Sequence, residues 1–252
     1  MTLSLLALAA AAAVQAPTTD SARLESCAAL ARANPDEALA RANEWRIRGG
    51  GIPARQCQGL AYAALERWPS AATAFEQAAR AAGDARDPRA SELWVQTGNA
   101  WLAAEEPTRA IEAFDAALAG DMLTPESRGL IHLDRARALV DLGNIAAARG
   151  DLQRGLELAP GDPFAWYLSA ALARREGSLD RARTDIARAL ELAPGEPDFL
   201  LLAGTIAGLA GDAAEARGFY ERAAAGPDSP AAAAARAALA APPPPAEAIP
   251  ED

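Results

Sequence analysis

Few residues in this sequence are of the types that carry chemistry. The 252 residues include a single His, His132, and two Cys, Cys27 and Cys57; all 24 basic residues are Arg, and Lys is absent. One imidazole and two thiols are too little for a transition-metal site or a His-dependent active site. A P-loop, a dinucleotide fingerprint and a zinc-protease helix are also absent, and no nucleophile has a plausible base partner. We therefore expect no enzyme activity, no metal site and no cofactor.

The composition favours a helical protein. Hydrophobic residues make up 51 % of the chain and aromatic residues 5 %, which is enough for a core, whereas β-branched residues are too scarce for a sheet protein. The 34 Asp and Glu against 24 Arg give a net charge of −10. Because the Arg are interleaved with acids and form no basic face, the charge pattern excludes a nucleic-acid binder.

The N-terminal segment predicts export. Leu3 to Val14 carries no charge and one polar residue, Ser4, and the small residues Val14 and Ala16 follow the spacing of a secretory cleavage site. We therefore expect a signal peptide over residues 1–16 and a periplasmic or secreted protein. Abundant Ala, Arg, Gly and Pro without Lys is typical of a GC-rich bacterial sequence. Two alternatives are an Ala-rich helix that packs on the fold and an uncleaved inner-membrane anchor.

A pattern repeats along the chain with a period of about 34 residues. In the unit that begins at Pro163, small residues at positions 8, 20 and 27 alternate with large residues at positions 4 and 24. Small residues let two antiparallel helices approach closely, large ones fill the gaps, and no unit buries its apolar face alone. Further units begin at Ile52, Ser91, Gly129 and Pro197. The pattern resembles the tetratricopeptide repeat.

The resemblance implies an all-α protein, an α-solenoid of stacked helix-turn-helix repeats with a C-terminal capping helix. We expect a degenerate helical hairpin at 17–51, five repeats at 52–228, a capping helix at 229–241 and a disordered, Pro-rich acidic tail at 242–252. The units that begin at Ile52 and Ser91 exceed the repeat length. We therefore expect longer turns around 83–89 and 120–126.

The resemblance also implies that the first helices of the repeats line a concave groove. The family's groove positions are filled here by a mixture of polar, aromatic and Arg residues, which suits an extended or helical peptide whose carboxylate an Arg can hold bidentately. The alternative is that Phe164, Tyr167 and Leu201 only pack between repeats. The candidate partner-binding residues are Gln56, Glu92, Asn99, Arg137, Phe164, Tyr167, Arg174 and Leu201.

Cys27 and Cys57 fall on the first helices of the first two units, which are neighbours in a stacked array. In an oxidising compartment we expect a disulfide between them; the alternative is two small buried hydrophobic residues. His132 stands at position 4 of its unit, a packing position, so we expect a satisfied imidazole.

These features together predict a non-enzymatic scaffold that binds a protein or peptide partner through the groove, as an adaptor or assembly factor in a bacterial envelope. The alternative is a structural or self-associating spacer that has no groove ligand. We expect contact with a membrane only if the N-terminal segment is uncleaved.

Overall fold

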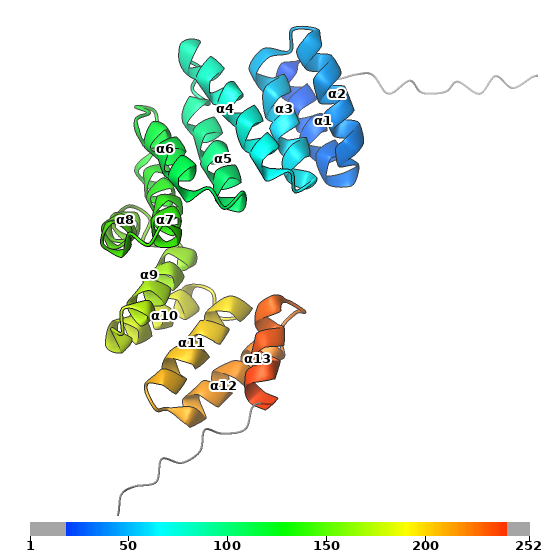
Figure 1. The fold of residues 1–252 in the computed structure, drawn as a ribbon. Coiled ribbons are helices and arrows are strands. Elements are labelled where there is room, and N and C mark those ends of the chain that lie inside the picture. The colour runs from blue at the N-terminus through cyan, green and yellow to red at the C-terminus, as the bar shows by residue number, and fades with distance from the viewer. Residues whose placement is uncertain (1–18, 241–252) are drawn as a thin grey trace, which may run out of the picture. The chain divides into compact units, whose positions relative to one another are not determined.

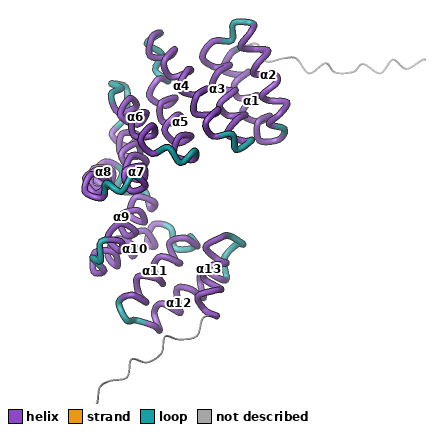
Figure 2. Tube along the Cα trace, viewed as in Figure 1, coloured by secondary structure: helices purple, strands orange, loops and turns teal. Residues whose placement is uncertain are grey.

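The computed structural model describes residues 19–240, and within that range the chain forms thirteen α-helices and no strand (Figures 1 and 2). This confirms the all-α fold. The predicted signal peptide and acidic tail lie outside the described residues. None of the described helices is both long and apolar enough to cross a membrane. The helices are α1 (Asp20–Ala33), α2 (Pro35–Ile47), α3 (Gly51–Ala64), α4 (Trp68–Asp84), α5 (Ala90–Ala103), α6 (Pro107–Leu118), α7 (Pro125–Asp141), α8 (Ile145–Leu158), α9 (Pro163–Arg175), α10 (Leu179–Leu192), α11 (Pro197–Leu209), α12 (Ala213–Ala224) and α13 (Pro230–Ala240).

The chain divides into two compact units between Glu106 and Pro107. Helices α1–α5 belong to the first unit and α6–α13 to the second. The repeat that the sequence pattern begins at Ser91 is therefore shared, with α5 in the first unit and α6 in the second. The 34-residue pattern alone does not reveal this division.

In the first unit, α3 packs on α1 and α2, and α4 packs on α3 and α5. Cys27 of α1 and Cys57 of α3 form a disulfide, with their Cα atoms 5.9 Å apart. Asn34 separates α1 from α2 and caps the second helix: its Oδ1 accepts a hydrogen bond from the Glu37 N–H at 3.3 Å, and Pro35 fills the first turn. The disulfide thus links α1 to α3, and the cap stabilises the start of α2.

In the second unit, α7 and α8, α9 and α10, and α11 and α12 form three packed hairpins. Ala170, Ala182 and Ala189 are fully buried between α9 and α10, as small residues at close helix crossings should be. Helix α13 packs on α11 and α12 and buries Ala235 in a cluster with Leu200 and Ala223. The last hairpin of this unit is thus covered by a helix.

The extra residues of the two long units lengthen helices more than the turns that we expected them to lengthen. Helices α4 and α7 each have 17 residues, so lengthened helices take up much of the insertion. Gly83 and Asp84 continue α4 after an Ala-rich stretch, and the connecting turns are short, at 85–89 and 119–124. Ala has the highest helix propensity, which favours extending the helix over a longer turn.

Candidate peptide-binding surfaces

The second unit carries a row of stacked aromatic rings across its first helices. Phe164 and Tyr167 of α9 stack with ring centroids 5.5 Å apart, and Tyr167 stacks on Phe199 of α11 at 5.0 Å. Phe199 is 4 % exposed, whereas Phe164 is 40 % exposed. The buried ring therefore fixes Tyr167 in place, and the exposed ring offers an apolar platform to a ligand.

Arginine side chains flank this row of rings. The Arg137 guanidinium of α7 lies 6.0 Å from the centroid of Phe164, a cation–π distance. Arg137 also lines a pocket of about 360 Å³ between α7 and α9, together with Arg174 and Arg175. The Arg174 Nε is buried and has no hydrogen-bond partner among the described residues. We call Arg137, Phe164, Tyr167, Arg174 and Phe199 the aromatic face.

Two charges near Tyr167 shift the pKa of its phenol in opposite directions. Burial raises the pKa of the Tyr167 phenol above its usual value, nearby Asp198 raises it further, and Arg174 lowers it. The hydroxyl is therefore neutral and able to donate a hydrogen bond at neutral pH. A ligand at the aromatic face meets apolar rings, a phenol donor and two guanidinium groups. Arg137 pairs with Asp134 at 3.3 Å, and the Nε of Arg174 has no partner among the described residues.

The first unit has a different surface on its first helices. Gln56 of α3 donates from Nε2 to the Oε1 of Gln96 of α5 at 3.2 Å, and Gln96 donates to the Glu92 carboxylate at 3.3 Å. Gln56 is 6 % exposed, and its Oε1 has no partner among the described residues. These three residues form what we call the amide row. In this row each amide donates one hydrogen bond to the next residue, and the row contains no aromatic ring.

The predicted binding residues therefore separate into groups. Arg137, Phe164, Tyr167 and Arg174 come together on the aromatic face, while Gln56 and Glu92 are joined in the amide row and Asn99 is exposed on the same helix as Glu92. Leu201 packs instead with Leu200 in the cluster that α13 covers.

Two residues that contribute to these surfaces are not among the binding residues predicted from the sequence. Phe199 and Gln96 stand at positions 3 and 6 of their units, next to the groove positions that the resemblance supplies. Their residue types, a ring and an amide on first helices, were the signal that could have found them.

A polar cluster in the second unit joins three helices. His132 Nδ1 lies 3.0 Å from Asp151 Oδ1, and Arg135 makes a bidentate pair with the same carboxylate and a further ion pair with Asp115. Hydrogen bonding to Asp151 raises the pKa of the Arg135 guanidinium, so it stays charged. This network ties α6, α7 and α8 together. No group of three metal-ligating side chains occurs among the described residues.

Comparison with known proteins gives the family. The tetratricopeptide repeat pattern matches residues 58–123, 133–197 and 172–230, together more than half of the chain. No curated protein matches this sequence.

Solved structures share the fold at low sequence identity. PilW, described as a widely conserved type IV pilus biogenesis factor, has a TM-score of 0.71 at 20 % identity, over 87 % of this chain and 99 % of that one. PilF of Pseudomonas aeruginosa has a TM-score of 0.64 at 16 % identity, over 81 % and 91 %. YrrB, described as a repeat protein with an unusual peptide-binding site, has a TM-score of 0.52 at 21 % identity, over 77 % and 96 %. Proteins of this kind generally mediate protein–protein interaction. The chain belongs to the tetratricopeptide repeat family.

Proposed function

We propose that this protein is a non-enzymatic adaptor that binds a peptide segment of another protein at the aromatic face. The observation that carries the proposal is the Arg174 Nε, buried and without a partner among the described residues, beside a row of rings whose outermost member, Phe164, is exposed. A buried guanidinium N–H without an acceptor is costly, and a ligand carboxylate removes that cost. Exposed rings that are fixed by neighbouring rings lose little conformational freedom on binding.

An envelope role fits several separate features. The uncharged N-terminal segment is typical of export, and a disulfide persists in an oxidising compartment. Similar folds include a pilus biogenesis factor, which makes assembly of an envelope structure a reasonable setting. We therefore propose that the adaptor serves an assembly process in a bacterial envelope.

The test is affinity capture from a crosslinked envelope fraction. The wild-type chain is compared with a Tyr167→Ala/Arg174→Glu double variant, which removes the central ring and reverses the charge at position 174. We expect partners that the wild type captures to be lost, since truncating one central aromatic anchor typically costs about 2 kcal/mol or more of binding free energy. Partners retained in full by the double variant would contradict the proposal.

Two controls define the result. Arg188→Glu reverses a charge at an exposed position of α10, where Arg188 pairs with Glu191, and it should capture the same partners as the wild type. Sedimentation of the purified chain tests the alternative of a self-associating spacer. Concentration-dependent association that the double variant abolishes would assign the aromatic face to a second copy of the chain.

A further inference from the structure

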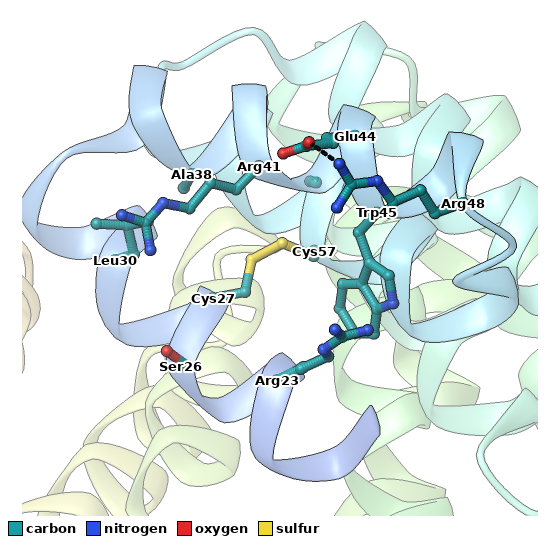
Figure 3. A pocket seen from close by; sticks show the side chains of 11 residues that line it. Arg23, Ser26, Cys27, Leu30, Ala38, Arg41, Glu44, Trp45, Arg48 and Cys57 are labelled. Carbon is teal, nitrogen blue, oxygen red and sulfur yellow. Dashed lines mark hydrogen bonds and ion pairs between the residues drawn. A yellow bond between two sulfur atoms is a disulfide. The ribbon is translucent and has the colours of Figure 1, made fainter. Parts of the chain in front are cut away.

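A second pocket lies at the N-terminal end of the first unit. It has a volume of about 310 Å³ and opens between α1 and α2 (Figure 3). Its floor is apolar and includes the Cys27–Cys57 disulfide, Leu30 and the ring of Trp45. The first unit therefore presents a small apolar cavity, at the lower end of the range of about 300–1,000 Å³ typical of ligand sites.

The rim of this pocket is basic although the chain as a whole is acidic. Four charged residues line it, namely Arg23, Arg41, Arg48 and Glu44, in a chain whose net charge is −10. The local charge is thus opposite in sign to that of the protein. A partner with negative charge is attracted to this position and repelled from most other surfaces.

The three guanidinium groups differ in how they are held. Arg41 pairs with Glu37 and Arg48 with Glu44, each at 2.5 Å. These are exposed pairs of a kind that contributes little free energy and exchanges readily for another carboxylate. Arg23 makes no ion pair among the described residues and instead lies 5.7 Å from the Trp45 ring centroid. Figure 3 shows Arg23 beside Trp45 at one side of the opening. Stacking on the ring face leaves the N–H edges of Arg23 available to an acceptor.

The α11–α12 hairpin of the second unit is covered by a further helix. There α13 packs on α11 and α12 and buries Ala235. Within the described residues, no helix covers the α1–α2 opening in the same way. The opening is therefore an accessible place for a segment of a partner.

We propose that this pocket binds an acidic peptide segment of a partner protein. An aliphatic side chain of the segment enters the apolar floor beside the disulfide and Trp45, and its carboxylates pair with Arg23 and, by displacing the intrachain partners, with Arg48 and Arg41. A nucleic acid fits less well, because Glu44 lines the pocket and Glu37 pairs with Arg41, and these carboxylates repel a phosphate backbone.

The test uses a fluorescein-labelled peptide of alternating Leu and Glu, with a matched peptide in which Gln replaces every Glu. Binding to the full chain is measured by fluorescence anisotropy. Because a hydrogen bond to a charged group contributes substantially, we expect the Gln peptide to bind at least about tenfold more weakly, and Arg23→Gln to weaken the Glu peptide by about tenfold. Arg188→Gln, at an exposed position of α10, is the matched control and should leave the affinity unchanged.

Hydrogen exchange locates the bound peptide. We expect protection in α1 and α2, since both helices line the pocket. Arg23 is exposed, so its substitution leaves the core intact, which thermal unfolding of the variant verifies.

Four outcomes overturn the proposal. Equal affinity for the Glu and Gln peptides would remove the role of charge, and full binding by Arg23→Gln would remove the role of this pocket. Loss of binding in Tyr167→Ala instead of Arg23→Gln would place the peptide on the aromatic face. A dimer that Arg23→Gln disperses, with no peptide affinity, would assign the pocket to a second copy of the chain.

Discussion

Both units make the same turn between the two helices of a repeat, but they build it from different residues. At position 15 the backbone has positive φ in every repeat: Glu66 and Glu105 have φ of 56° and 60° in the first unit, whereas Gly143, Gly177 and Gly211 have 82°, 75° and 87° in the second. Turns in both units have the same backbone hydrogen bond. The N–H of the following residue bonds to the carbonyl five residues earlier, at 2.9 Å from Arg67 to Tyr62 and at 2.9 Å from Ser178 to Ala173.

This comparison separates what the fold requires from what the residue contributes. The hydrogen bonds at the helix end impose the left-handed conformation, and Gly adopts it without steric cost. For a residue with a Cβ atom, this left-handed conformation costs roughly 1 kcal/mol of free energy. Among the described residues, the first unit therefore carries strained turns that the second unit lacks, and it also contains the disulfide.

The largest expected effect comes from removing that disulfide. The bond spans 30 residues, and on the chain-entropy model Cys27→Ser/Cys57→Ser should lower the free energy of unfolding by roughly 3.5 kcal/mol. The loss should be confined to the first unit, which hydrogen exchange resolved by segment measures directly. Wild-type protein in reducing agent is the matched control and should lose the same amount; an equal loss in α9–α12 would show that the units do not unfold separately.

Next in size is a pair of matched Gly substitutions. A Cβ on Gly59 would overlap the Phe75 ring, and a Cβ on Gly204 would overlap the Tyr220 ring. Phe75 is 4 % exposed and has no room to move, whereas Tyr220 is half-buried. Gly59→Ala should therefore destabilise the chain by about 1–3 kcal/mol. For Gly204→Ala we expect a smaller effect, because the Tyr220 ring can shift. The gain in helix propensity of about 1 kcal/mol, which both substitutions share, then offsets more of the cost. Denaturant titration ranks the two variants, and the reverse order would refute the argument from ring mobility.

Exchanging the turn residues between the units tests how much Gly contributes at position 15. Gly177→Glu should destabilise the second unit by about 1 kcal/mol, because Glu lacks the freedom of Gly at positive φ. Glu66→Gly should stabilise the first unit by less than about 1 kcal/mol, since Gly also gains entropy in the unfolded chain. Thermal unfolding of both variants supplies the measurement. Changes of equal sign in the two variants would contradict the account.

The smallest effect concerns the turn between α4 and α5. Asp87 accepts hydrogen bonds from the Arg89 side chain and backbone N–H, and these bonds lower the pKa of the Asp87 carboxyl from 3.8 to about 2. The folded-state pKa is depressed, so this stabilisation is present above pH 4 and is lost as the pH falls from about 4 to about 2. Asp87→Asn should cost about 1 kcal/mol or less at pH 7.

The pH profile is the sharper measurement for Asp87. The difference in unfolding free energy between wild type and Asp87→Asn should shrink toward zero near pH 2. A difference that stays constant with pH would mean that the carboxylate charge is not what stabilises this turn.

Much of the fold could be predicted because the packing of the repeat requires small and large residues at fixed positions in the sequence. Ala170, Ala182 and Ala189 are buried at the positions where the period places small residues, and each of these positions has a steric reason. Three of the five turns carry Gly at position 15, while Glu66 and Glu105 adopt the same geometry without that signal. Local backbone hydrogen bonds fix those two turns, which a search for Gly misses.

The division after Glu106 and the composition of the surfaces were less predictable. The pattern describes how neighbouring helices pack, and it carries no signal for where one compact unit ends. On the aromatic face, Phe199 joins Phe164 and Tyr167 through contacts between residues from different repeats. The pocket between α1 and α2 belongs to the most degenerate hairpin, where the repeat positions are hardest to assign.

The cysteine content also determines how the chain can be oxidised. With two cysteines in the sequence, Cys27 and Cys57 allow a single intramolecular connectivity. A misfolded monomer with a wrong disulfide therefore does not exist for this chain, and maturation needs an electron acceptor but no isomerase. The remaining error is a bridge between two chains, so the oxidised monomer and the crosslinked dimer are the two products to be separated when the protein is prepared.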